Sequence, residues 1–190
     1  NQGMILGSSA FIYRISGSQT YVSKDLLKSE ITYEPIRVDV NLVNASEEID
    51  VEGLKKWQPQ FATAIFELSE GVFKVGREVE KMSKSKYNVV NPDEICDQYG
   101  ADTLRMYEMF LGPLEQAKPW NTAGISGVHN FLRKFWKLFY KEDEFIVTDS
   151  IPDKKALKTL HETIKKITED IESFSFNTCI SSFMICVNEL

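Results

Sequence analysis

The sequence lacks the two glycine-rich motifs that most often bind nucleotide phosphates. Neither GxxxxGK[ST] nor GxGxxG occurs in its 190 residues, which excludes a P-loop and a dinucleotide fingerprint. Histidine is scarce: His129 and His161 lie in helical patterns without a suitable neighbour, so we expect surface or packed helix residues. The three cysteines show no CxxC spacing, which argues against a metal knuckle or redox pair and predicts reduced, buried thiols. They are Cys96, Cys179 and Cys186.

Long apolar runs and an excess of positive charge are also missing. No stretch approaches the ~18 apolar residues of a membrane span, and the start, NQGMILGSSAFIYR, lacks the cationic and then apolar layout of a signal peptide. With 22 basic and 28 acidic residues the net charge is -6, which argues against bulk attraction to nucleic acid or to an anionic membrane. The sequence therefore predicts a soluble, cytoplasmic protein with no membrane partner. Any polyanion would have to be bound by local basic patches.

Hydrophobic residues make up 43% of the chain and aromatic residues 12%, enough to build a core. Residues 1 to 80 favour strands, because β-branched and aromatic runs are separated by turn-formers such as Gly17-Ser18 and Glu70-Gly71. The runs are AFIYRI, TYVS, EPIRVDVNLV, FATAIFEL and VFKVG. We expect a small mixed sheet here, with a hairpin over residues 71–80.

Helical periodicity begins after residue 90. Asn91 is the expected N-cap of a helix with Pro92 at its first position and Glu94 in its first turn. Gly100 is expected to end it, and a second helix begins near Asp102. Three apolar stripes at helical spacing follow: Val128, Phe131, Leu132, Phe135, Leu138 and Phe139; Leu157, Leu160, Ile164, Ile167 and Ile171; and Ile180, Phe183, Met184, Val187 and Leu190.

The predicted fold class is therefore α+β, with a strand-rich N-terminal part followed by an all-α helical bundle portion. The last apolar stripe runs up to Leu190, and no initiator Met begins the chain. Both features predict a piece of a larger protein.

One segment, EKMSKSKYN at residues 80–88, places three lysines and two serines between Lys81 and Lys86. Crowded ammonium groups repel one another, so the cluster indicates an anion between them. The segment lies between two expected ordered elements and can close over a ligand. A nucleotide triphosphate fits best, because flexible cations can follow phosphate oxygens while hydroxyls and backbone N–H groups fill the gaps. A solvated turn or a phosphorylation site is the alternative.

The pentapeptide Lys81-Met82-Ser83-Lys84-Ser85 is identical to the KMSKS signature of class I aminoacyl-tRNA synthetases, a match expected by chance on the order of once in 10⁴ sequences of this length. The following stretch, KYNVVNPDEICDQYGADTLRMYEMF, resembles the link from that loop to the helical stem in the branched-aliphatic members. NQGMILG, PWNTAGISGVHNFLRKFWKLFY and SFNTCISSFMICVNEL resemble the leucyl branch. Isoleucyl and valyl enzymes share the loop and the GAD helix and remain alternatives.

The resemblance implies four parts. Residues 1–15 and 72–92 would be the end of the Rossmann-like catalytic fold, 16–71 a small mixed β insertion of the leucine-specific type, 93–145 the stem-contact helices, and 146–190 the first helices of the anticodon-binding domain. It implies an intact monomeric ligase that activates leucine with ATP and Mg²⁺ and transfers it to tRNA(Leu). The piece alone is expected to be inactive, because the family's HxGH motif and leucine pocket are absent from it.

For the site, the resemblance implies that Lys84 stabilises charge on the departing phosphates and that Lys81 supports it. Met82, Ser83 and Ser85 would complete the nucleotide-binding loop, with the serines shaping it. No carboxylate cluster that must bind Mg²⁺ is evident.

Weaker candidates for tRNA contact lie in the helical half. Trp120 stands at a helix entrance, where an aromatic residue is more often a packing anchor. Arg133, Lys134 and Lys137 share a polar helix side that suits tRNA phosphates or simply faces solvent. A rival from another class is a non-catalytic module that docks RNA or protein, with the lysine segment an incidental surface feature.

Overall fold

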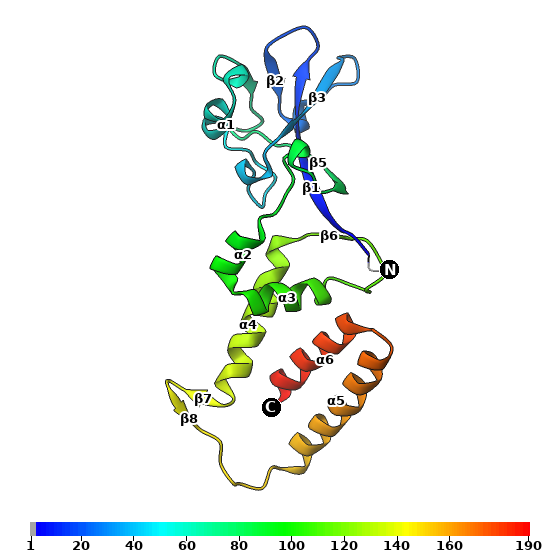
Figure 1. The fold of residues 1–190 in the computed structure, drawn as a ribbon. Helices are drawn as coiled ribbons and strands as arrows, with labels where there is room; N and C mark the ends of the chain where they lie inside the picture. The colour runs from blue at the N-terminus through cyan, green and yellow to red at the C-terminus, as the bar shows by residue number, and fades with distance from the viewer. Residues whose placement is uncertain (1–2) are drawn as a thin grey trace. The chain divides into compact units, whose positions relative to one another are not determined.

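The computed structural model describes residues 3–190 and divides the chain into two compact units (Figure 1). Residues 5–90 form a unit built on a β-sheet. Residues 91–190, with residues 3 and 4, form a helical unit. Strands thus precede helices along the chain, which confirms the predicted α+β class.

The sheet of the first unit is organised around one long strand, β1. Its order is β3-β1-β2-β4, and β5 also pairs with β1. β1 is antiparallel to β2, β3 and β5, whereas β2 and β4 are parallel, so the sheet is mixed as expected. The strands are β1 (Ile5–Ile15), β2 (Thr20–Val22), β3 (Tyr33–Val38), β4 (Ile65–Glu67) and β5 (Gly76–Lys81).

The predicted hairpin over residues 71–80 is wrong. Residues 76–81 pair instead with the first half of β1, from Phe11↔Gly76 to Leu6↔Lys81. Before this strand, residues 73–75 pair with residues 47–49 through a bridge at Glu48↔Lys74, and a tight bridge joins Ser69 to Val72. The Ile49 N–H donates to the Phe73 carbonyl at 3.0 Å and the Val75 N–H donates to the Glu47 carbonyl at 2.9 Å, so residues 73–75 do not pair with β5.

Short helical segments in this unit were not expected from the sequence. They are α1 (Val51–Trp57) and the 3₁₀ turns η1 (Lys24–Leu26), η2 (Val40–Leu42), η3 (Pro59–Phe61) and η4 (Lys84–Lys86). Asp50 caps α1 by accepting a hydrogen bond from the Gly53 N–H at 3.0 Å, which satisfies one of the unpaired donors of the first turn.

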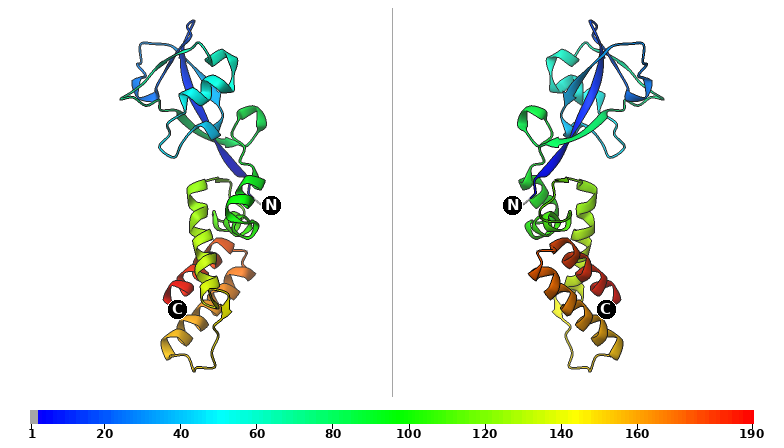
Figure 2. Two further views of the ribbon diagram at one scale, coloured as in Figure 1. Left: turned by 90° about the vertical axis from the view of Figure 1, so that its left-hand side faces the viewer. Right: turned by 90° about the vertical axis from the view of Figure 1, so that its right-hand side faces the viewer.

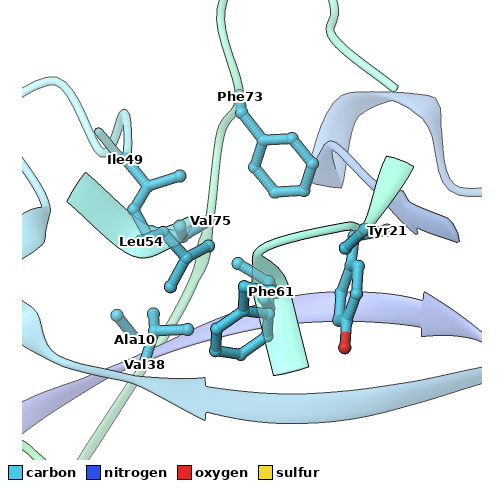
Figure 3. Close-up of a cluster of buried hydrophobic side chains, with 10 residues drawn as sticks. Ala10, Tyr21, Val38, Ile49, Leu54, Phe61, Phe73 and Val75 are labelled. Atoms are coloured by element: carbon cyan, nitrogen blue, oxygen red, sulfur yellow. The ribbon is translucent and has the colours of Figure 1, made fainter. Parts of the chain in front are cut away.

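The core of the first unit lies between the sheet and the α1–η3 segment (Figure 3). Leu54 of α1, Phe61 of η3 and Phe73 are almost completely buried, and they meet Ala10 of β1 and Val38 of β3 in one cluster. Burying a large apolar side chain contributes roughly 1.5–3 kcal/mol. This core therefore fixes β1, the strand with which β5 pairs immediately before the lysine segment.

The second unit contains the predicted helices. They are α2 (Pro92–Tyr99), α3 (Ala101–Phe110), α4 (Thr122–Lys137), α5 (Lys154–Glu172) and α6 (Phe176–Glu189), with short strands β6 (Lys118–Pro119), β7 (Tyr140–Lys141) and β8 (Glu144–Phe145). As predicted, Asn91 caps α2 by accepting from the Asp93 N–H at 3.1 Å, and Gly100, with φ 87°, ends it.

Helix α6 packs against α3, α4 and α5, and α5 runs beside it (Figure 2). The three predicted apolar stripes lie mainly on α4, α5 and α6. Each is buried only in part: Val128 and Phe131 are covered, whereas Ile164 is 51% exposed and Phe183 40%.

None of the helices within residues 3–190 is both long and apolar enough to cross a membrane. Cys179 and Cys186 are buried, as expected, whereas Cys96 is only partly buried.

Candidate functional site

The lysine loop, defined here as residues 81–88, follows β5 as a tight turn. Lys81 is the last residue of β5, and residues 84–86 form η4. Two backbone hydrogen bonds close the turn: Lys86 N–H donates to the Ser83 carbonyl at 3.0 Å, and Tyr87 N–H donates to the Lys84 carbonyl at 3.2 Å. Tyr87 then adopts the left-handed conformation, with φ 54° and ψ 33°, which turns the chain back under the loop.

The three lysines of this loop differ in what they contact. Lys86 Nζ forms an ion pair with Glu80, which also accepts from Arg37 Nε at 3.3 Å. Lys81 and Lys84 are exposed and make no ion pair with any residue between 3 and 190. Two ammonium groups are therefore available to a ligand, while the third is neutralised by the protein.

Glu80 is the anchor for the engaged lysine. Its side chain is only 18% exposed. Hydrogen bonds from Lys86, from the Ser9 hydroxyl and from Arg37 lower the pKa of Glu80 to about 2. The carboxylate is therefore ionised throughout the neutral range and remains a partner for Lys86.

Asn88 ties the two ends of the lysine loop together. This side chain is 1% exposed. Its Oδ1 accepts a hydrogen bond from the Ser83 N–H at 2.8 Å, and its Nδ2 donates to the Lys81 carbonyl at 3.3 Å and to the Ser9 Oγ at 2.9 Å. No local pattern in the sequence indicated this role, because the partners include a strand residue 79 positions away.

The remaining residues of the pentapeptide shape the loop. The Ser83 and Ser85 hydroxyls lie 2.8 Å apart and bond to each other. Met82 is partly buried beside Gly7 of β1, where an added Cβ would come within 2.6 Å of the Asn88 carbonyl oxygen and 2.9 Å of the Met82 Cγ. Close approach of loop and strand thus requires glycine at this position.

The described residues contain no cluster of three or more His, Cys, Asp or Glu side chains that could hold a metal ion.

The basic residues of α4 separate onto two sides. Arg133 and Lys137 line an open depression of about 460 Å³, together with Trp136. Lys134 points elsewhere and donates to Asn188 Oδ1 of α6 at 2.8 Å. Trp136 is 59% exposed, and its ring stacks on Tyr140 with centroids 4.3 Å apart. Trp136 was not predicted as a site residue, although its position between two basic residues at helical spacing could have indicated one.

Trp120 and the histidines make local contacts within the helical unit. Trp120 Nε1 donates to Thr122 Oγ1 at 2.9 Å, and its ring meets Tyr107 edge-on at 5.2 Å. His129 Nδ1 lies 3.1 Å from the Tyr99 carbonyl, and His161 is exposed. Both histidines are therefore packed or surface residues, as expected.

Two family models match the chain. Residues 68–120, which include the lysine loop and α2 and α3, match "tRNA synthetases class I (I, L, M and V)". Residues 153–190, which include α5 and α6, match "Anticodon-binding domain of tRNA ligase".

Curated relatives match over the whole chain. A leucine–tRNA ligase of Christiangramia forsetii is 67% identical over 190 residues, and one of Porphyromonas gingivalis is 56% identical over 190 residues. Each match covers 100% of this chain and 20% of the relative.

A solved structure of an Agrobacterium radiobacter K84 leucyl-tRNA synthetase, in a ternary complex with tRNA and LeuAMS, is 26% identical. The match covers 58% of this chain and 16% of that one, with a TM-score of 0.48. This chain spans about a fifth of the length of the curated relatives it matches. By its identity to those relatives over all of its residues, the chain belongs to the leucyl-tRNA synthetase family.

Proposed function

We propose that this chain is the part of a leucine–tRNA ligase that carries the phosphate-binding lysine loop and the start of the anticodon-binding domain. In the complete enzyme, a cytoplasmic monomer in this proposal, leucine reacts with ATP to give leucyl-adenylate and pyrophosphate, and the leucyl group then passes to tRNA(Leu). The names of the relatives favour leucine over isoleucine and valine.

The proposed parts keep the boundaries expected from the sequence: catalytic end at 1–15 and 72–92, insertion at 16–71, stem-contact helices at 93–145, and anticodon-binding helices from 146 onward. The family matches at 68–120 and 153–190 support the catalytic and anticodon-binding assignments.

One observation carries the proposed role of the loop: Lys81 and Lys84 make no ion pair with any residue that the structure describes, while the neighbouring Lys86 is engaged by Glu80. As the leucine carboxylate attacks the α-phosphorus, negative charge accumulates on the departing pyrophosphate. A free ammonium group can move onto that charge without giving up a carboxylate partner. Such a contact lowers the barrier to the extent that it strengthens as pyrophosphate departs.

In this mechanism Lys84 provides the main stabilising charge and Lys81 supports it, while Met82, Ser83 and Ser85 hold the loop's shape beside the phosphates. Mg²⁺ bound to the ATP phosphates would supply further neutralisation of their charge. The residues of this chain act on the phosphates directly.

Replacement of Lys84 tests the proposal. In the full-length ligase, Lys84→Ala should slow adenylate formation in a pre-steady-state assay by about 10² to 10³, the effect of losing one preorganised donor at a developing oxyanion. Lys28→Ala is the matched control, because Lys28 is an exposed lysine of the same unit without an ion pair to any described residue. A Lys84→Ala rate within twofold of the unmutated enzyme would refute the proposal.

The 190-residue chain by itself should show no leucine-dependent pyrophosphate exchange, since the family's HxGH motif is not in it. Trypsin digestion distinguishes a nucleotide-binding loop from a non-catalytic docking module. If the loop binds nucleotide, ATP should protect Lys81 and Lys84 from cleavage in the full-length ligase. Unchanged cleavage at both lysines would favour the docking module.

For the tRNA, the surface we propose is the depression lined by Arg133 and Lys137, with Trp136 beside them. Guanidinium and ammonium groups bind the phosphate backbone, and the exposed indole offers a face for stacking. Lys134 and Trp120 remain candidates for tRNA contact. We expect them to contribute less to tRNA affinity, because their polar groups already have partners within the helical unit.

A further inference from the structure

We propose that Asn88 is a positioning residue that holds the lysine loop in the conformation in which Lys81 and Lys84 are free. Three hydrogen bonds support this assignment: two join Asn88, at the end of the loop, to Lys81 and Ser83 at its start, and one joins it to Ser9 of strand β1. The catalytic consequence rests on the proposed function of the loop, whereas the structural part, a clamp formed by a buried amide, does not.

The clamp requires a side chain that both accepts and donates. Oδ1 of Asn88 accepts from the Ser83 N–H, while Nδ2 donates to the Lys81 carbonyl. A carboxylate only accepts and an alanine does neither, so either substitution leaves buried polar groups without partners. Because Asn88 is almost fully buried, water cannot easily replace these bonds.

The same buried network also holds Lys86, so that its ammonium group is not available to a ligand. Asn88 Nδ2 donates to the Ser9 hydroxyl, Ser9 donates to Glu80, and Glu80 holds Lys86. Ser9 is 0% exposed, so the network runs from β1 beneath the loop. Fixing the loop and neutralising one of its three lysines are therefore two results of a single set of contacts.

The residue before Asn88 secures the other side of the turn. The Tyr87 carbonyl accepts from the Val40 N–H at 3.1 Å, and the Tyr87 ring meets Trp57 of α1 edge-on at 4.9 Å. With Tyr87 held against the folded core, loss of the Asn88 bonds should free residues 82–86 without unfolding the sheet.

Hydrogen exchange tests the clamp without any assumption about function. In the 190-residue chain, Asn88→Ala should speed exchange of the Ser83 amide at least about tenfold, because local opening no longer breaks a hydrogen bond. The Ile12 amide in the centre of β1 should keep its exchange rate. Asn44→Ala is the matched control, since Asn44 also accepts from two backbone N–H groups, but in a distant turn of the same unit. An unchanged Ser83 amide in Asn88→Ala overturns the clamp.

Kinetics in the full-length ligase test the positioning role. Asn88→Ala should lower the rate of adenylate formation per titrated active site about 10- to 100-fold, as expected for misplaced catalytic groups. The KM for ATP should change less than about threefold, because the lysines act mainly in the transition state. A purely structural role would reduce the number of active sites and leave the rate per site unchanged.

Parallel assay of Lys84→Ala distinguishes failure of this inference from failure of the proposed function. If Lys84→Ala slows adenylate formation and Asn88→Ala does not, the positioning role is overturned and the proposed function stands. If neither variant slows it, the proposed function fails, and the positioning role fails with it.

Asn88→Asp separates the two donated bonds from the accepted one. It keeps the size and the acceptor for Ser83 while losing both donors, and because the rate per titrated active site counts only folded enzyme, the loss in rate should remain. A normal rate in a folded Asn88→Asp variant would also overturn the proposal.

Discussion

The lysine loop and α4 each carry three basic residues, in one case on a turn and in the other on a regular helix. In the loop, Lys81 and Lys84 make no ion pair among the described residues, and Lys86 is held by Glu80. On α4, Arg133 and Lys137 line a depression. Lys134 is held by Asn188. Each region therefore offers two cations and ties down a third.

The difference lies in what fixes the backbone. The cations of α4 are placed by the hydrogen bonds of a regular helix, so one side-chain substitution leaves their positions unchanged. The loop has two turn hydrogen bonds and depends on the amide of Asn88. A positioned helix suits a static partner such as an RNA backbone, whereas a clamped loop suits a ligand whose charge changes during reaction.

The largest expected effect is that the two regions serve different reaction steps, so that changes on α4 affect tRNA binding and not amino-acid activation. Reversing both helix charges, Arg133→Glu with Lys137→Glu, should raise the KM for tRNA(Leu) by about tenfold or more and reduce the salt dependence of tRNA binding by about two contacts. Amino-acid activation should be unaffected, because no phosphate of ATP meets this surface in the proposed function.

Steady-state aminoacylation and pyrophosphate exchange measure the two steps. Lys28→Glu with Lys56→Glu, two exposed lysines of the sheet unit outside the depression, reverses the same charge and serves as the control. Equal losses of tRNA affinity in both double variants would show that only net charge matters.

A smaller effect concerns acid stability of the first unit. The pKa of Glu80 is lowered to about 2 in the folded chain, from an ordinary value of 4.5. Its interactions therefore stabilise the fold above about pH 4.5, and this contribution is lost as the pH falls toward 2.

Glu80→Gln should remove that part of the pH dependence, measured as the urea midpoint of the sheet unit at several pH values between 7 and 2.5. Glu52→Gln is the control, because Glu52 is an exposed residue whose only ion pair is to Lys55 on the same helix. A Glu80→Gln profile that still follows that of the unmutated chain below pH 4.5 would assign the acid sensitivity to other carboxylates.

Local signals in the sequence predicted the helical half well. Asn91 as cap, Pro92 at the first position and Gly100 at the end of α2 all act within a few residues, and the structure confirms them. The strands were partly predicted, but β5 was assigned to a hairpin because its actual partner, β1, lies some 70 positions earlier. Pairing at such separation leaves no trace in local periodicity.

The candidate site shows the same limit. The pentapeptide at residues 81–85 singled out Lys81 and Lys84 by its resemblance, yet nothing in the sequence indicated what Lys86 contacts. Its partner is Glu80 of β5, which it reaches because the η4 turn brings the chain back toward the end of that strand. Asn88 was overlooked because its three partners meet only in the folded chain.

The most direct test of the division among the loop lysines is to assay Lys84→Ala and Lys86→Ala side by side for single-turnover adenylate formation in the full-length ligase. Lys84→Ala should lose about 10² to 10³ in rate. Lys86→Ala should lose about tenfold or less, because its ammonium group serves Glu80 rather than the phosphates. An equal or larger loss in Lys86→Ala would contradict the assignment of Lys84 as the free, phosphate-directed lysine.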